Sequence, residues 1–278
     1  MVNAFLKHVL CWEDITPGWF GHTKSFYGTV EQQGRLTLHL HLLLWIQNAL
    51  SPQQIRDRLL DPNSIFAQHL VDYIESVHQG EFLTGTFAEV NTRIPEKDYK
   101  PPTHTLPLAP PPLCAGGVNC ICEQCQKLEH WWTQYELEVD DLLLRSNMHD
   151  CRRSTQQEKE DDNKKNWRVK VKGSLLKNKK YERKGCLTKE GICRARFPRD
   201  IFPLTQIDPV DGHIDLKKLE PKMNTFTPLI TYLNRCNTDV TCLLSGTAVK
   251  AVVSYVSDYV SKLSLKTYQI FATIYDVF

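Results

Sequence analysis

The sequence lacks any run of about 20 apolar residues, the length that a membrane-spanning helix requires, and we expect no membrane as a partner. Its first ten residues, MVNAFLKHVL, have neither a long apolar stretch nor a small-residue cleavage site, so they do not resemble a secretory signal peptide. A phosphate-binding loop of the form Gly-x-x-x-x-Gly-Lys-Ser/Thr is also missing, and we expect no ATP hydrolysis by this chain. These absences predict a protein of a reducing compartment.

The chain has little net charge. Its 34 Lys and Arg against 32 Asp and Glu give +2, so any case for nucleic-acid binding depends on local patches. Residues 164–184 form such a patch, with ten Lys or Arg and one Glu. Within it, residues 167–172 alternate like an amphipathic strand, which favours a phosphate-contacting surface over a solvated loop. The candidate contacts are Arg168, Lys170, Lys172, Lys179 and Lys180.

The 278 residues suffice for one large domain or two small ones. The pattern in residues 1–92 predicts a folded part that begins with strands. A helix that starts at Ser51-Pro52 and a second helix over residues 64–77 should follow. Residues 93–128 predict a Pro-rich linker followed by a cysteine cluster, and residues 129–200 a helix over 129–144 and a Cys/His-rich, basic insertion. Residues 201–278 form the C-terminal part, with a further helix.

Two histidines separated by one apolar residue, His39 and His41, lie in the leucine-rich run 34–45. The alternation predicts a strand on which both imidazoles leave the same face, placed to hold one divalent metal ion. The opposite, leucine face should belong to a core. Glu31 and Gln33 lie just upstream, beyond a turn at Gly34, and could return as an antiparallel hairpin. A purely structural role for the histidines is the alternative.

A second constellation lies near the C-terminal end. Val249, Val253, Val256 and Val260 recur at helical spacing, although the valines also favour a strand. On a helix, Tyr255, Tyr259 and Lys262 form a stripe on another face. The alternative interpretation is two tyrosines packed on a core with their hydroxyls at its rim.

These groups suit phosphodiester transesterification. A phenol has a pKa of about 10 and is a poor nucleophile at neutral pH. A metal ion on the scissile phosphate withdraws charge and orients the bond, and a lysine stabilises the charge that develops. Imidazoles with a carboxylate or amide suit Mn²⁺ or, with waters, Mg²⁺. Two tyrosines allow two such transfers in succession.

The ten cysteines predict thiols and zinc ligands rather than disulfides. His149, Cys151, Cys186 and Cys193 supply one His and three Cys, a ligand set typical of structural zinc, with scattered buried thiols as the alternative. Cys120, Cys122 and Cys125 could form another site, with either Cys114 or His130 as fourth ligand.

Four segments together resemble the Rep domain of fungal Helitron transposons. They are FGHTKSFYGTVEQQGR leading to His39-Leu40-His41, GCLTKEGICRARFP around Cys186, TFTPLITYLNRCNTDVTCLLSG from Thr225, and YVSDYVSK from Tyr255. The resemblance covers most of the chain in order and is weakest between residues 80 and 145. No single segment would be specific alone.

The resemblance implies an HUH endonuclease of the two-tyrosine type, related to rolling-circle replication initiators and relaxases. Its fold would be α+β, a central antiparallel sheet flanked by helices, here with a zinc-binding, cysteine-rich insertion. His39 and His41 match the metal-binding pair, and Tyr255 and Tyr259 match the nucleophiles, followed by Lys262. Glu31 is the implied third metal ligand and Gln33 the alternative.

The implied activity is nicking and joining of single-stranded DNA with Mg²⁺ or Mn²⁺, alongside structural Zn²⁺. Family members carry a helicase domain, so single-stranded DNA and a helicase supplied in trans are the expected partners, and the nucleus, or otherwise the cytoplasm, the expected location. Family members also have more sequence before Phe20, which predicts a truncated copy. The alternative is therefore a catalytically inactive, zinc-stabilised DNA-binding remnant.

Overall fold

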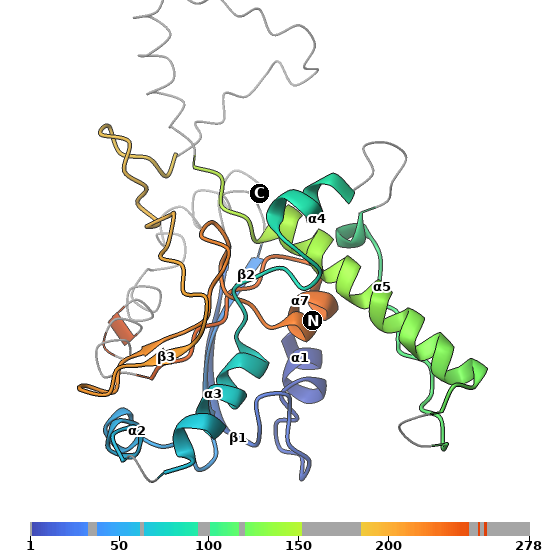
Figure 1. Ribbon diagram of the computed structural model, residues 1–278, viewed down its shortest axis with the longest axis horizontal. Helices are drawn as coiled ribbons and strands as arrows, with labels where there is room; N and C mark the ends of the chain where they lie inside the picture. Colours follow the sequence, from blue (N-terminus) through green and yellow to red (C-terminus); the bar gives the residue numbers. More distant parts are fainter. Residues whose placement is uncertain are drawn as a thin grey trace, which may run out of the picture. The chain divides into compact units, whose positions relative to one another are not determined.

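The computed structural model describes residues 2–32, 38–61, 64–93, 101–116, 120–151, 185–244, 250 and 253–254. It is a mixed α+β protein with two small antiparallel sheets, β1–β2 and β3–β4 (Figure 1). The elements are α1 (Val2–His8), β1 (Thr23–Gln32), β2 (Leu38–Ile46), α2 (Pro52–Leu59), α3 (Phe66–Val77), α4 (Phe87–Arg93), the 3-10 helix η1 (Pro102–His104), α5 (Glu123–Ser146), β3 (Gln206–Ile207), β4 (Ile214–Asp215) and α7 (Pro228–Asn234).

The chain divides into two compact units. The first comprises residues 1–69, 207–214 and 242–278, and the second comprises residues 70–206 and 215–241. The four-part organisation expected from the sequence stays a prediction. In the described part of the chain, no helix is both long and apolar enough to cross a membrane.

The first unit is built on the antiparallel hairpin of β1 and β2. Its register pairs Thr29 with His41 and Glu31 with His39. Trp12 packs edge-on against Phe26 of β1 with ring centroids 5.1 Å apart, so the segment after α1 is packed against this strand. The expected strand around the His-x-His pair is therefore present as β2.

The leucine face of β2 is less buried than the sequence indicated. Leu42 and Leu44 are half-buried, but Leu38 is 73% exposed and Leu40 is 38% exposed. Leu40 lies opposite Val30, which is itself 55% exposed. The expectation of a core is thus wrong for the Leu38 end of the strand, because the side chains there, Leu38, Leu40 and the opposite Val30, are all exposed.

Helix α2 begins as its sequence predicts. Ser51 is the N-cap residue, with its hydroxyl accepting from the backbone N–H of Gln54 at 3.3 Å, while the Gln54 side chain accepts from the N–H of Ser51 at 2.9 Å. Pro52 occupies the first turn, where a missing N–H costs nothing. This reciprocal pair satisfies two N–H groups that a helix start otherwise leaves unpaired.

The second unit is organised by α5, which η1, α4 and α7 contact (Figure 1). Tyr135, Val139, Leu142 and Leu143 recur at helical spacing and are buried. They form one apolar side of the helix, which the predicted helix over 129–144 already contained. The core around it consists of Phe82, Val90, Tyr135, Val139, Leu143, Met223, Phe226 and Tyr232.

Candidate metal centres

Four cysteines gather at the start of α5 and form the four-cysteine cluster, Cys114, Cys120, Cys122 and Cys125. Their sulfur atoms all lie within 4.8 Å of one another, and all four thiols are free. Cys122 is the N-cap residue of α5, and Cys125 lies in its first turn. Cys114, rather than His130, completes the set, because His130 lies more than one turn beyond Cys125 on the helix.

The sulfur–sulfur distances in this cluster fit tetrahedral coordination. They are 3.6 Å for Cys114–Cys120, 3.5 Å for Cys114–Cys122 and 3.8 Å for Cys122–Cys125. A tetrahedron with Zn–S bonds of about 2.3 Å has edges of about 3.8 Å, whereas a disulfide holds its sulfurs about 2.05 Å apart. The cluster could therefore hold a metal ion such as zinc.

Gly116 is part of the architecture of the four-cysteine cluster. Its backbone N–H donates to the sulfur of Cys114 at 3.2 Å. A Cβ at this position would lie 2.8 Å from the sulfur of Cys120 and 3.3 Å from that of Cys114. The loop can therefore close around the sulfurs only with glycine here.

The thiols of this cluster have different acidities before any metal binds. The backbone amide of Cys125 and the neighbouring thiols lower the pKa of Cys122 to about 6. The amide acts by its proximity, because the geometry between it and the Cys122 sulfur does not meet that of a helix-cap hydrogen bond. Desolvation and the adjacent thiols raise the pKa of Cys125 to about 12. Since zinc binds thiolates, Cys122 would supply a ready ligand at neutral pH, and Cys125 would have to lose its proton when a metal ion binds.

A second set, the His–Cys cluster, consists of His149, Cys151, Cys186 and Cys193. One ligand atom from each lies within 4.8 Å of the others, so the structure brings together the four residues that the sequence singled out for zinc. The sulfur of Cys193 lies 3.3 Å from Nε2 of His149. Zn–S and Zn–N bonds of about 2.3 and 2.05 Å at a tetrahedral angle place these atoms about 3.6 Å apart.

Local structure explains how these ligands meet. His149 follows the end of α5, and its backbone N–H donates to the carbonyl of Lys222 at 2.7 Å. Cys193 pairs with Leu187 across a short antiparallel bridge, which folds the loop back beside Cys186. The His149 ring stacks on Phe197, with centroids 4.2 Å apart and an angle of 13° between the planes.

Desolvation sets the protonation of the His–Cys cluster. It lowers the pKa of His149, which favours the neutral imidazole that binds zinc. Desolvation and the neighbouring thiols raise the pKa of Cys151 to about 11. A metal ion bound here would therefore have to displace a proton from Cys151, and its affinity should fall as the pH falls.

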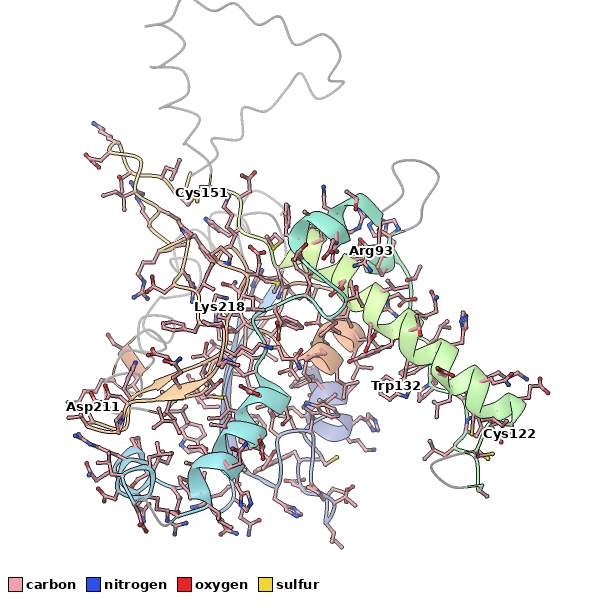
Figure 2. The ribbon with its side chains drawn as sticks, in the orientation of Figure 1. Arg93, Cys122, Trp132, Cys151, Asp211 and Lys218 are labelled. Atoms are coloured by element: carbon pink, nitrogen blue, oxygen red, sulfur yellow. The ribbon has the colours of Figure 1, made fainter. Side chains whose placement is uncertain are left out.

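The two clusters lie at opposite ends of α5. Figure 2 shows Cys122 at one end of this helix and Cys151 beyond the other. The 24 residues of α5 span about 36 Å at about 1.5 Å each. The clusters are therefore separate candidate sites, each with four candidate ligands, the number typical of structural rather than catalytic zinc.

The histidine pair lies in the first unit, on β2. His39 and His41 are half-buried and two residues apart, so they share one face of the strand. The register places Glu31 of β1 opposite His39, and positions that face each other across an antiparallel ladder share a sheet face. Gln33, the alternative third ligand, lies outside the described residues.

Thr29 completes this face of the hairpin and was missed by the sequence analysis. It lies opposite His41, and its hydroxyl is buried without a hydrogen-bond partner among the described residues. Such a hydroxyl costs about 1–3 kcal/mol unless a water or a ligand satisfies it. Thr29 thus adds a buried polar group to the strand face that carries His39 and His41. The sequence signal that could have identified Thr29 is its spacing of two residues from Glu31, which places both positions on the same face of β1.

The remaining candidates lie outside the described residues. They are the nucleophiles and lysine expected from the sequence, Tyr255, Tyr259 and Lys262, and the basic residues Arg168, Lys170, Lys172, Lys179 and Lys180. Lys250, Val253 and Ser254, just before the tyrosines, have helical backbone. That is the secondary structure that the valine spacing favoured there.

No protein-family model, no curated protein and no solved structure matches the chain.

Proposed function

We propose that the chain is a metal-dependent enzyme that nicks and joins single-stranded DNA, an HUH endonuclease of the kind found in Helitron Rep domains. One observation carries the proposal: His39 and His41 share a face of β2, with position 31, a glutamate, directly opposite His39. Two imidazoles and a carboxylate suit Mn²⁺ or Mg²⁺. The sequence motifs that resemble Helitron Rep domains support the same activity.

In this proposal the phenol oxygen of Tyr255 or Tyr259 attacks the scissile phosphorus. The phenol gives up its proton as a bond forms between its oxygen and phosphorus, the bond from phosphorus to the 3′ oxygen breaks, and the departing 3′ oxygen takes up a proton to become a hydroxyl. The 5′ phosphate remains on the tyrosine, which preserves the phosphodiester bond for rejoining. Lys262 stabilises the negative charge on the phosphate. A bound divalent ion would supply electrophilic activation of that phosphate.

The second tyrosine gives the chain a second transfer. After the first cleavage, the other phenol can cut a second strand. The 3′ hydroxyl of each strand can then attack the phosphotyrosine formed with the other strand. The number of phosphodiester bonds is unchanged, so joining needs no ATP. Residues 164–184 would neutralise the phosphates of the bound strand, and a helicase in trans would supply that strand.

A second candidate is a DNA-binding remnant without catalysis, stabilised by zinc. The observation that favours it is the contrast between the sites. Each cysteine-containing cluster has four ligands within 4.8 Å, whereas β2 pairs only with β1 among the described residues. A remnant would bind zinc and DNA but form no covalent adduct on any strand.

The test is a denaturing gel of the full chain incubated with Mn²⁺ and labelled single-stranded oligonucleotides. We expect a protein–DNA adduct that resists denaturant and disappears when Tyr255→Phe and Tyr259→Phe are combined. The matched control is Tyr73→Phe on α3, an exposed tyrosine that should leave the adduct intact. A folded, DNA-binding protein without adduct would favour the remnant.

The metal dependence has its own test. His39→Ala with His41→Ala should abolish the adduct while both clusters keep their zinc, since the histidine pair lies in the other unit. His22→Ala with His69→Ala is the matched control, because both lie outside the proposed site. An adduct that survives the loss of His39 and His41 would contradict the proposal.

A further inference from the structure

The surface around the His–Cys cluster carries four exposed cations: Arg194, Arg196, Arg199 and Lys222. Three are tied by backbone hydrogen bonds to ligand residues. The N–H of Arg194 donates to the carbonyl of Cys186 at 2.7 Å, and that of Arg196 to Cys193 at 2.9 Å. The carbonyl of Lys222 accepts from the N–H of His149 at 2.7 Å.

Arg199 is positioned by a stack of groups that ends at a metal ligand. Its guanidinium lies 4.7 Å from the ring centroid of Phe197, and that buried ring stacks on His149 at 4.2 Å. A metal ion on His149 would fix the orientation of its ring. Because Phe197 stacks on this ring and the Arg199 guanidinium lies over Phe197, fixing His149 would also restrict the position of the guanidinium.

Among the residues that the structure describes, no carboxylate lies within 4.0 Å of a side-chain nitrogen of these four cations, although the Glu220 carboxylate accepts from the backbone N–H of Lys222 at 3.2 Å. Elsewhere in the same unit the cations are paired: Arg145 with Asp141 at 2.6 Å, Arg235 with Glu138 at 2.5 Å and Lys217 with Glu81 at 2.5 Å. Residues 185–200 contain Lys189 and three arginines against Glu190 and Asp200. The surface thus offers the guanidinium groups of Arg194 and Arg196 to an anion, whereas the charge of Arg199 also interacts with the carboxylate of Asp239.

We infer that the metal-loaded His–Cys cluster presents Arg194, Arg196, Arg199 and Lys222 as a binding surface for the phosphates of single-stranded DNA. Guanidinium groups bind phosphate oxygens through paired N–H donors, and a backbone held by a metal centre spares them much of the ordering cost. The identity of the strand rests on the proposed function. The surface itself rests on the cluster geometry.

The test is equilibrium binding of fluorescent oligo-dT to the full chain at several salt concentrations, in the Tyr255→Phe/Tyr259→Phe background so that cleavage plays no part. Each phosphate contact contributes about 0.7 to the slope of log affinity against log salt. Arg194→Gln with Arg196→Gln should lower that slope by about 1.4 and weaken binding about 25-fold at 0.1 M salt. Glutamine leaves the backbone cost at Arg196, where φ is 60°, unchanged.

Two matched variants serve as controls, one that keeps the charge at positions 194 and 196 and one that removes the same charge elsewhere in the chain. Arg194→Lys with Arg196→Lys keeps the charge and should retain most of the slope. Arg56→Gln with Arg58→Gln removes two exposed arginines from α2 and should leave the slope unchanged. An equal loss in the α2 variant, or an unchanged slope in the Arg194/Arg196 variant, would overturn the inference.

Two further comparisons test the role of zinc and the preference for deoxyribose over ribose. Cys193→Ser, which breaks the cluster, should reduce oligo-dT affinity at least as much as the double arginine variant, and undiminished affinity would overturn the role of the metal. A preference of more than tenfold for oligo-rU would overturn the assignment to DNA. Arginine-dependent binding without a tyrosine adduct would sink the proposed function and leave this surface standing. A tyrosine adduct together with an unchanged salt slope in the Arg194/Arg196 variant would support the proposed function and overturn this surface.

Discussion

Gly116 shows how a single residue can set metal affinity without being a ligand. Since a Cβ would lie 2.8 Å from the sulfur of Cys120, Gly116→Ala forces that ligand out of its position. We expect zinc affinity at the four-cysteine cluster to fall about 10–100-fold, as for other supporting residues of metal sites. Competition with a chromophoric chelator measures it, and the His–Cys cluster is the internal control. Equal weakening of both clusters would show general misfolding instead.

His78 predicts a pH dependence of stability. Burial lowers its pKa to about 4, and its Nδ1 has no hydrogen-bond partner among the described residues. In the unfolded chain the pKa is about 6.5, so the unfolded state binds a proton that the folded state refuses. The free energy of unfolding should therefore decrease as the pH falls from about 6.5 to about 4, by up to about 3 kcal/mol.

Urea unfolding of the wild type and of His78→Gln at pH 7.5, 6 and 5 measures this contribution. Protonation of the metal ligands is common to both proteins and cancels in the comparison. We expect the difference in unfolding free energy between them to shift in favour of His78→Gln as the pH falls. Parallel pH profiles would mean that His78 titrates normally in the folded protein.

At the scale of elements, α5 is held in the second unit by a buried carboxylate. Asp140 is 1% exposed and accepts hydrogen bonds from the N–H of Leu83 at 2.7 Å and of Thr84 at 2.9 Å, and from the Thr84 hydroxyl at 2.5 Å. Arg93 of α4 lies 3.8 Å from it. The helix thereby anchors both α4 and the loop before it.

Asp140→Asn should therefore destabilise the protein. An amide keeps the shape but replaces one accepting oxygen with a donor that faces another donor, which costs about 2–4 kcal/mol. Urea unfolding at pH 7 measures the loss. Glu129→Gln, on an exposed position of the same helix, should change the unfolding free energy by less than about 0.5 kcal/mol. Similar losses in both variants would contradict the anchoring role.

Elements with strong local signals were predictable. The alternation around His39 and His41 indicated β2, and Ser51-Pro52 indicated the start of α2, because strand period and helix capping depend on neighbouring residues only. The exposure of Leu38 was not predictable from the same alternation. Alternation says which residues share a face, but what covers that face depends on distant segments.

The same limit applies to the candidate sites. Ligand chemistry alone singled out the His–Cys set, although its members are far apart in sequence. The choice between Cys114 and His130 needed the helix start at Glu123, which fixes where each side chain points. Thr29 became visible only through the register of β1 against β2. The roles of Tyr255 and Tyr259 stay predictions.

At the scale of the whole molecule, both clusters lie in the second unit but close loops of different length. The four-cysteine cluster joins residues within a short segment, whereas the His–Cys cluster joins Cys151 to Cys186 and Cys193. A link that closes a longer loop removes more entropy from the unfolded chain. We expect two zinc ions per chain, measured by plasma mass spectrometry, and one after either Cys125→Ser or Cys193→Ser.

The thermal consequence follows from the loop lengths. Cys193→Ser should lower the melting temperature more than Cys125→Ser, because it opens the longer loop and removes the one ligand of that cluster that is buried. Differential scanning calorimetry of the two variants gives the comparison. The opposite order, or a wild type without bound zinc, would contradict this account of the second unit.

Peptide mapping of the protein after incubation with Mn²⁺ and cleavable single-stranded DNA would identify the attacking residue. We expect a nucleotide joined through a 5′ phosphate to Tyr255 or Tyr259, and to no other residue, in a protein that carries two zinc ions. A folded, zinc-loaded and DNA-binding protein whose tyrosine peptides stay unmodified on every strand tested would contradict it.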